Sequence, residues 1–272
     1  MDDFKLQSFE TLGEGTFGKV YLSRGPGDRE VALKVLSVSE TNNLDKIKKE
    51  IRIHSLISPH IHIIQILGSF SEHRNMCLVL EYISGTVLND LELSASTLAK
   101  YMYQLIIGLI HIHEHRVMHR DLKLDNIMIG SDGNLKIVDF GCAEMFPSKY
   151  TTYVGTDEYK APEMLCRKKM HDHQVDTWAV GVLLYELLTS KLSFRGVNDE
   201  DVGWSEESKI IIWPKEGVLS ANFHACHLIT NLLKEEPSDR ISLCDVLKHP
   251  FMKYDVNSRG GDVVMPKTRQ TM

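Results

Sequence analysis

Asp121, Asn126 and Asp139 are the residues of this sequence whose types and spacing indicate chemistry most directly. Asp121 and Asn126 belong to a polar stretch, residues 119–126, which has apolar residues on both sides. The turn-forming residues 130–133 predict two short strands that return the chain and bring Asp139 beside this stretch. Two carboxylates and an amide can hold Mg²⁺ through oxygen and leave one carboxylate to accept a proton from a hydroxyl. Phosphoryl transfer requires these parts, although the stretch taken alone can also be a solvated loop.

A glycine-rich turn near the N-terminus is the second candidate site. Gly13-Glu14-Gly15-Thr16-Phe17-Gly18 lies between predicted strands in the segment 9–36, and no helix follows it. This position favours a loop that covers nucleotide phosphates over a dinucleotide-binding turn. Lys34 follows on an alternating strand from which it can reach the phosphates, while Val20 and Ala32 can cover an adenine ring. The alternative is that Lys34 is a surface lysine at a strand end.

Helical periodicity over residues 44–57 supplies a partner for that lysine. The residues expected on one side of this helix are Leu44, Ile47, Ile51 and His54. Glu50 then falls sixteen positions after Lys34 and is its expected ion-pair partner. Because glutamates in helices are more often solvated, this assignment depends on the neighbouring motifs.

The N-terminal lobe is expected to end at a hinge. Residues 61–70 and 76–81 predict two more strands, which complete a sheet of five. Small residues then break the apolar pattern, and backbone groups of Glu81, Tyr82 and Ile83 can bind the edge of an adenine ring. The predicted divisions of the chain are a small lobe at 1–82, a large lobe at 83–254 and a flexible tail at 255–272.

Beyond the hinge the sequence is mainly helical. The predicted helices span residues 97–115, 175–188, 223–234 and 243–249. The second is apolar on nearly every side and must be buried, so Asp176 near its start needs hydrogen-bond donors. The predicted fold class is α+β with two lobes, a small one of five antiparallel strands plus one helix and a large, mainly helical one.

The composition bounds the remaining classes of protein. The 272 residues are 43% hydrophobic and 25% charged, which is sufficient for a large core. The apolar runs are too short for a membrane helix, and the first residues show no signal-peptide pattern. A net charge of −6 argues against nucleic acid as the main partner. The five cysteines are scattered and form no Cys-x-x-Cys pair, so neither a disulfide framework nor a zinc site is expected.

These motifs together resemble those of protein kinases. His119-Arg120-Asp121-Leu122-Lys123-Leu124-Asp125-Asn126, followed by Asp139-Phe140-Gly141, is similar to the catalytic and metal-binding loops of that family. Residues 155–163 resemble the substrate-docking end of an activation segment. The lysine at position 123 is typical of serine/threonine kinases, and the resemblance covers nearly the whole chain.

Within that family the chain resembles the Aurora kinases. Residues 147–156, 169–178 and 85–87 carry this resemblance. The chain departs from the Aurora pattern at Leu124-Asp125, where Pro-Glu is usual, and at Lys149-Tyr150, where those kinases have arginines. Its hinge is also one residue shorter, and the regulatory N-terminal extension common among Aurora kinases is not expected.

The resemblance implies a role for each candidate residue, with ATP and Mg²⁺ as cofactors. Asp121 would orient and deprotonate the substrate hydroxyl, and Lys123 would neutralise charge on the transferring phosphate. Asn126 and Asp139 would hold Mg²⁺. The implied nucleotide-binding residues are Gly13, Glu14, Gly15, Gly18, Val20, Ala32, Lys34, Leu80, Glu81, Tyr82, Ile83 and Met128. The implied structural residues are Asp176, bound by backbone amides of the catalytic loop, and the ion pair of Glu163 with Arg240.

Regulation is expected to act through the activation segment. We expect phosphorylation at Thr152, with Thr151 as second choice, to order residues 142–162. Arg120 would receive the phosphate through charge-assisted hydrogen bonds. The alternative is that the two threonines belong to an ordinary polar loop.

Substrate preference is expected to depend on two carboxylates. Asp125 and Glu186 match the acidic positions that hold an arginine two residues before the target serine or threonine in arginine-preferring kinases, and Thr156 would lie beside the substrate. The alternative is that Asp125 is solvated and Glu186 has a structural partner.

We expect a monomeric catalytic unit of cytoplasm and nucleus, associated with spindle or chromosomes, that acts on proteins with basic motifs. An activating protein is expected on the small lobe, and neither nucleic acid nor membrane is an expected partner. The alternatives are another basophilic serine/threonine kinase, a pseudokinase scaffold and a small-molecule kinase. A scaffold usually lacks a catalytic part, whereas this sequence has the full set.

Overall fold

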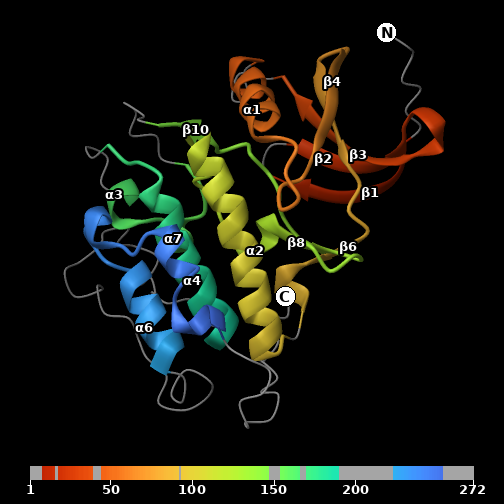
Figure 1. Cartoon of the computed structure of the whole chain (residues 1–272). Coiled ribbons are helices and arrows are strands. Elements are labelled where there is room, and N and C mark those ends of the chain that lie inside the picture. The colour runs from red at the N-terminus through yellow and green to blue at the C-terminus, as the bar shows by residue number, and fades with distance from the viewer. Residues whose placement is uncertain are drawn as a thin grey trace, which may run out of the picture.

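The protein is described by a computed structural model of two lobes (Figure 1). The structure describes residues 8–15, 18–38, 44–91, 93–146, 154–165, 170–189 and 223–253. The predicted tail, 255–272, lies outside these residues. Within the described part of the chain, no helix is long and apolar enough to cross a membrane.

A five-stranded antiparallel sheet forms the small lobe. Its strands are β1 (Ser8–Gly15), β2 (Gly18–Arg24), β3 (Glu30–Ser37), β4 (Ile66–Glu72) and β5 (Asn75–Glu81), in the spatial order β1-β2-β3-β5-β4. On β3 both faces are covered, because Val31 and Leu33 pack on the outer side while Ala32 and Leu36 join the main core. This double burial explains why β3 is almost continuously apolar.

Helix α1 (Leu44–Ile57) covers one face of this sheet and matches the predicted range. Its buried residues are Ile47, Glu50, Ile53, His54 and Ile57. The prediction that Leu44 lies on this side is wrong, because Leu44 begins the helix and is 37% exposed.

The predicted strand over residues 61–70 begins later than expected. Residues 61–65 cross to the large lobe, where Ile64 donates to the carbonyl of Ile137 at 3.0 Å and Ile63 forms an isolated parallel bridge with Ile137. Ile63 and Ile64 are buried there, so their apolar character reflects packing between lobes. Strand β4 starts only at Ile66.

The large lobe is built around two long helices (Figure 1). Helix α2 (Ala95–Glu114) starts at Ser94, whose hydroxyl accepts from the Thr97 amide. Helix α4 (Gln174–Thr189) is buried from Val175 to Leu188, as its apolar sequence requires. The shorter helices are α3 (Pro162–Leu165), α6 (Phe223–Leu232) and α7 (Leu243–Val246). The last two end earlier than predicted, and a short 3-10 turn over Pro250–Lys253 follows α7.

Two small sheets position the catalytic segment between the lobes. Strands β6 (Gly85–Val87), β8 (Ile127–Gly130) and β9 (Leu135–Ile137) form one sheet, and β7 (Val117–Met118) pairs with β10 (Glu144–Met145) in the other. Residues 119–126 run from β7 to β8, so both ends of this loop are fixed by strand pairing. At Gly85 any Cβ would lie 2.0 Å from the Ile129 carbonyl oxygen, so only glycine allows β6 to approach β8.

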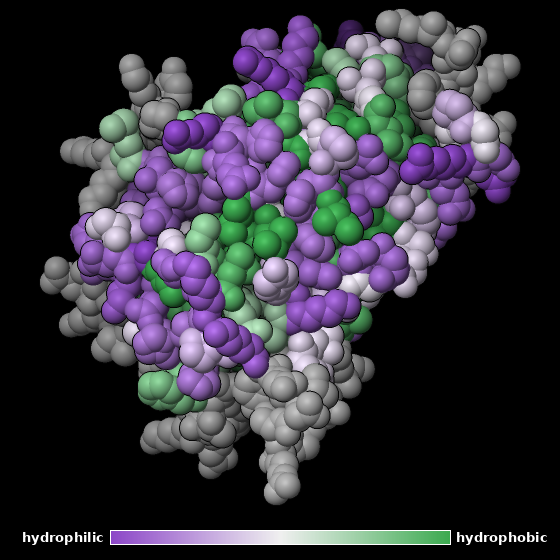
Figure 2. All heavy atoms as spheres, in the orientation of Figure 1, coloured by the Kyte–Doolittle hydropathy of each residue, from purple (hydrophilic) through white to green (hydrophobic). Residues whose placement is uncertain are grey.

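The hydrophobic core continues from one lobe into the other. A single cluster of buried residues extends from Ala32 on β3 to Phe251 near the end of the described chain. Figure 2 shows the outer surface in the same view, where hydrophilic side chains surround smaller hydrophobic areas. The segment 82–84, between β5 and β6, has no regular secondary structure, and the predicted lobe boundary falls in it.

Candidate active site

Lys34 links the two lobes through its ammonium group. Lys34 Nζ lies 2.7 Å from Glu50 Oε1 on α1 and 2.7 Å from Asp139 Oδ1, which follows β9. Burial alone would lower the pKa of Lys34, but the two carboxylates outweigh it and raise the pKa above its ordinary value. The lysine is therefore charged, and the ion pair expected from the sixteen-residue spacing forms.

Asp121 is held at the centre of the site by neighbours from two segments. Its Oδ1 accepts from the Thr156 amide at 2.9 Å and from the Thr156 hydroxyl at 2.8 Å. Asn126 Nδ2 donates to the Asp121 backbone carbonyl at 2.8 Å and to its Oδ2 at 3.3 Å. The carboxylate is therefore fixed at the position where a substrate hydroxyl could be oriented.

Asn126 and Asp139 have the right donor atoms for Mg²⁺. The Asn126 amide nitrogen points at Asp121, which leaves its oxygen for a metal. Asp139 Oδ1 is bound by Lys34 and by the Gly141 amide, and its second oxygen is the one available for a metal. Oxygen ligands of this kind suit Mg²⁺, so the residues fit the implied cofactor. The described residues contain no group of three or more His, Cys, Asp or Glu side chains that could hold a metal without a substrate.

Asp176 on α4 anchors the catalytic loop. Its oxygens accept from the amides of His119 and Arg120 at 2.8 and 2.9 Å and from His113 Nε2 at 2.9 Å. Burial would raise the pKa of Asp176, but the hydrogen bonds from His113 and from the Arg120 amide help to hold it below its ordinary value. The buried carboxylate therefore has the backbone donors that its sequence position requires.

Two residues of the site have left-handed backbone conformations. Arg120 has φ 67° and Asp139 has φ 60°, values that cost free energy for residues other than glycine. The loop around Arg120 is stabilised by Asp176, and Asp139 is fixed by Lys34. Such strain is common where a side chain must be aimed at a reaction centre.

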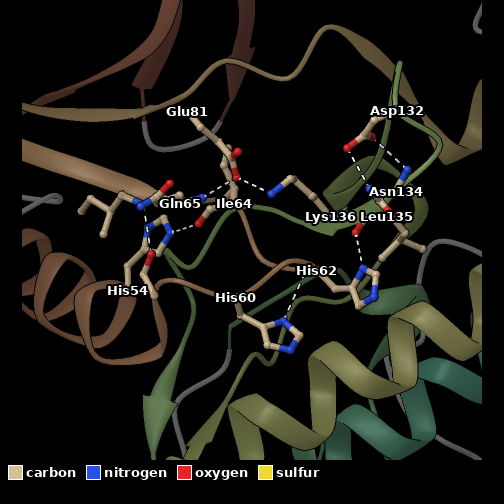
Figure 3. Close-up of polar contacts among 12 residues, drawn as sticks. His54, His60, His62, Ile64, Gln65, Glu81, Asp132, Asn134, Leu135 and Lys136 are labelled. Carbon is tan, nitrogen blue, oxygen red and sulfur yellow. Dashed lines mark hydrogen bonds and ion pairs between the residues drawn. The ribbon is translucent and has the colours of Figure 1, made fainter.

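Phe140 and two histidines form a cluster of rings, in tilted and edge-on contacts, between α1 and the catalytic loop. The Phe140 ring centroid lies 4.8 Å from that of His54 and 5.0 Å from that of His119. Nε2 of His54 hydrogen-bonds the Ile64 carbonyl at 2.6 Å (Figure 3). Burial lowers the pKa of His54 to about 4, so its ring is neutral. Sequence reasoning placed His54 on the helix face but did not find this contact.

The nucleotide-binding candidates gather on the inner side of the sheet. Val20 pairs with Lys34 across β2 and β3, and Ala32 pairs with Leu80 on β5. A Cβ at Gly18 would lie 2.2 Å from the Val35 carbonyl oxygen, so this glycine is required by the close strand approach. Two further candidates lie on β1, where Gly13 has open space beside it and Glu14 forms an ion pair with Lys19 at 3.3 Å. Gly15 ends this strand. The remaining candidates are Tyr82 and Ile83, which follow β5, and Met128, which packs on the core.

Glu81 at the end of β5 is held from both lobes. Its Oε1 accepts from the Gln65 amide at 2.7 Å and from Lys136 Nζ at 2.6 Å (Figure 3). Lys136 belongs to β9 beside the catalytic loop. The hinge therefore carries an ion pair that sequence reasoning missed, because its partners are 55 residues apart.

The two carboxylates expected to bind a substrate arginine both act on the hydroxyl of Tyr159. Glu186 is 6% exposed, and the Tyr159 hydroxyl donates a short hydrogen bond to its Oε2. Burial and the charges of Glu186 and Asp125 raise the pKa of Tyr159 well above its ordinary value. Tyr159 is therefore a structural partner of Glu186, as the alternative interpretation of the sequence proposed. Asp125 is exposed, which also agrees with that alternative.

The ion pair of Glu163 with Arg240 is bidentate. Arg240 Nη1 and Nη2 lie 2.6 and 2.7 Å from the two Glu163 oxygens, and the guanidinium stands 5.1 Å from the centroid of the Trp178 ring. Both charged side chains are buried. The pair expected from the resemblance therefore joins α3 to the segment after α6.

The regulatory candidates are only partly described. Thr151 and Thr152 lie outside the described residues. Arg120 is buried, and its Nε donates to the Cys142 carbonyl at 2.7 Å. Its Nη2 lies 3.7 Å from Glu144 Oε2, a contact that sequence reasoning did not find. The proposed receiver of a phosphate therefore already faces a carboxylate.

A small antiparallel lobe and a helical lobe that join at a lysine, two carboxylates and an asparagine define a protein kinase. The protein kinase domain family matches residues 6–252. The predicted fold class is confirmed by this match together with the observed sheet order.

Three relatives show the subfamily. An Aurora kinase of Dictyostelium discoideum is 34% identical over 263 residues, which cover 93% of this chain and 66% of that protein. An Aurora kinase of Encephalitozoon cuniculi is 34% identical over 255 residues, covering 89% and 91%. The serine/threonine-protein kinase Aurora-1 of Arabidopsis thaliana is 33% identical over 269 residues, covering 96% and 90%. The chain thus spans just under two thirds of the first relative and most of the other two. It belongs to the protein kinase family, as a serine/threonine kinase close to the Aurora kinases.

Proposed function

We propose that this chain transfers the γ-phosphate of ATP to serine or threonine hydroxyls of proteins. The observation that carries the proposal is the fixed Asp121 carboxylate, bound by Thr156 and Asn126, beside the ion pair of Lys34 with Asp139. Phosphoryl transfer needs a general base for the hydroxyl, here Asp121, and charged groups that position the phosphates, here Lys34 and Asp139.

Each residue has a separate part in this reaction. Asp121 orients the substrate hydroxyl and accepts its proton, and Lys123 offsets charge on the transferring phosphate. Lys34 holds the other phosphates while Glu50 holds Lys34. Asn126 and Asp139 would hold Mg²⁺, which would neutralise part of the phosphate charge. Positioning and electrostatics therefore account for most of the rate enhancement.

Phosphate transfer to peptides tests this proposal against its rivals. Wild type should phosphorylate a serine or threonine peptide with Mg²⁺ and ATP, and Asp139→Asn should abolish transfer. Asp245→Asn, which changes an exposed carboxylate far from the site, is the matched control. Transfer to a small molecule alone would favour a small-molecule kinase, and ATP binding without transfer would favour a scaffold.

We also propose a preference for arginine two positions before the target residue. Asp125 supports the preference directly because its side chain is exposed. Glu186 supports it because a substrate guanidinium could replace the Tyr159 hydroxyl as the donor to its carboxylate. Arginine binds paired carboxylates better than lysine because its planar fork gives directional hydrogen bonds. In a peptide array, kcat/KM should fall on the order of 10-fold for the peptide in which that arginine is replaced by alanine. Equal rates for both peptides would contradict the preference.

The cellular setting is proposed from kinship alone. From the resemblance to Aurora kinases we propose a role in mitosis or chromosome segregation, an activating protein on the small lobe, and a cytoplasmic and nuclear location. Phosphorylation at Thr152, or second at Thr151, remains the proposed activating event. Activity of Thr152→Val, alone and with Thr151→Val, after incubation with ATP tests it. Wild-type activity in both variants would contradict it.

A further inference from the structure

Glu144 makes contacts that connect three parts of the kinase. It lies on β10, where it pairs with Met118 of β7, the strand that leads directly into the catalytic loop. Its Oε2 lies 2.8 Å from Lys49 Nζ on helix α1 and 3.7 Å from Arg120 Nη2 in the catalytic loop. One carboxylate oxygen therefore faces a cation from each lobe, and its own backbone is fixed to the large lobe.

The charges and burial of these groups indicate that the Glu144 carboxylate stabilises both cations. The Arg120 side chain is 2% exposed, that of Glu144 is 20% exposed and that of Lys49 is 40% exposed. A buried guanidinium needs a nearby anion because burial disfavours its charge. Without Glu144, Lys49 and Arg120 would face each other as two cations and would repel, which would push α1 away from the catalytic loop.

The position of Lys49 in α1 gives this contact a consequence for catalysis. Lys49 directly precedes Glu50, whose carboxylate holds Lys34 at 2.7 Å. Adjacent helical residues point about 100° apart, so one turn of α1 contacts the large lobe through Lys49 and the nucleotide lysine through Glu50. A shift of α1 away from Glu144 would therefore separate Glu50 from Lys34.

We propose that Glu144 is a positioning residue that clamps α1 to the catalytic loop, through Lys49 and Arg120, and thereby maintains the ion pair of Lys34 with Glu50. The proposal deepens the proposed kinase function and rests on it where activity is measured. It adds that a carboxylate on β10 helps to keep the catalytic residues of the two lobes in place.

The test uses substitutions that keep the size of the side chains and remove their charge. Glu144→Gln and Lys49→Met are made singly and together, with Lys49→Arg as the charge-conserving variant. Lys48→Met is the matched control, because Lys48 is exposed on the same helix and forms no ion pair with the described residues. Each variant is measured for kcat, for KM of ATP and peptide, for Tm and for amide hydrogen exchange of residues 44–57.

The expected result is a specific loss in kcat. Glu144→Gln should lower kcat about three- to tenfold, because Lys49 loses its ion-pair partner and the buried Arg120 loses one of the anions near it. KM for peptide should change less than about twofold, since the cluster includes none of the residues proposed to bind peptide. The double variant should lose much less than the product of the single losses, and Lys49→Arg should retain most activity. Hydrogen exchange in α1 should accelerate in Glu144→Gln and stay unchanged in Lys48→Met.

Other outcomes would overturn the clamp. A fall in Tm with unchanged kcat and unchanged α1 exchange would make Glu144 an ordinary stabilising residue, and multiplicative single losses would show that Lys49 and Glu144 act separately. If wild type transferred no phosphate at all, the proposed function would fail. The exchange of residues 44–57 would still decide the clamp, because it is read without catalysis.

Discussion

Lys34 shows how a single side chain can join the elements of this site. It stands between a carboxylate from helix α1 and a carboxylate from the loop after β9, at 2.7 Å from each. The carboxylates of Glu50 and Asp139 outweigh the effect of burial and keep the lysine charged. The residue is therefore sensitive both to its own geometry and to loss of either partner.

Replacement of Lys34 by arginine should remove activity while the fold remains. The planar guanidinium of Lys34→Arg cannot occupy the space of a compact ammonium between two carboxylates and a phosphate. We expect kcat to fall on the order of 100-fold or more, as when other fixed charge-stabilising groups are lost. Phosphate transfer measured together with circular dichroism checks this. Rates close to wild type would remove Lys34 from the nucleotide site.

Loss of the Glu50 charge should have a smaller effect of a different kind. Glu50→Gln leaves Lys34 with Asp139 as its remaining anionic partner, so the lysine stays charged but is less well positioned. We expect kcat to fall roughly tenfold while the Kd of ATP changes by less than about threefold. Equilibrium binding of ATP and steady-state kinetics separate the two. A large loss of binding with unchanged kcat would contradict the assignment.

At the scale of elements, the buried ion pair of Glu163 with Arg240 connects α3 to the segment between α6 and α7. Arg240 also donates to the backbone carbonyls of Gln174, Lys234 and Glu235. One guanidinium therefore satisfies the ends of several elements at once. This explains why a residue outside every helix can be among the most buried charged groups of the large lobe.

Breaking this pair should destabilise the fold severely. Arg240→Met leaves the Glu163 carboxylate buried without its partner, which costs about 3–5 kcal/mol. The double variant Arg240→Met with Glu163→Met should lose less, because no unpaired charge remains. Urea unfolding measures both. Lys248→Met, which breaks the exposed pair with Asp245, should leave stability almost unchanged and is the control.

The sequence predicted the elements of the fold better than their contacts. Local patterns located α1, α2, α4 and the strands around the catalytic loop, because period and turn residues are properties of short segments. The apolar residues Ile63 and Ile64 were read as strand because burial between lobes and burial in a sheet give the same pattern. Contacts such as Tyr159 with Glu186 and Lys49 with Glu144 were missed, since nothing local specifies a partner tens of residues away.

At the scale of the whole molecule, histidines lie where the lobes join. The segment between α1 and β4 carries His60 and His62, and the His60 ring stacks at 4.4 Å on His111 of α2. His62 hydrogen-bonds the Leu135 carbonyl through Nδ1 at 3.0 Å (Figure 3). Burial first, and then His111, His62, Lys136 and His115, lower the pKa of His60 to about 4. The His60 ring at this joint is therefore neutral.

This joint should make the protein sensitive to mild acid. An unfolded histidine binds a proton near pH 6.5, whereas His54 and His60 do so only near pH 4 in the folded chain. Between these values the unfolded chain binds more protons, so stability falls as the pH decreases from about 6.5 towards 4. Tm measured from pH 7.5 to 5 should decrease, and less steeply in His60→Asn. A slope that does not change in this variant would show that His60 does not contribute.

The anchoring of the catalytic loop by Asp176 has a consequence for how the protein tolerates mutation. The donors at residues 119 and 120 are peptide N–H groups, which every amino acid except proline carries. The attachment is therefore indifferent to the side chains of the two residues it holds, whereas one change at position 176 releases both. At positions 119 and 120 only proline should remove one of these donors, whereas almost every substitution at position 176 should release the loop, and amide hydrogen exchange of residues 119–126 should separate the two cases. Asp176, more than fifty residues away on α4, therefore holds the backbone of the catalytic loop whichever side chains residues 119 and 120 carry.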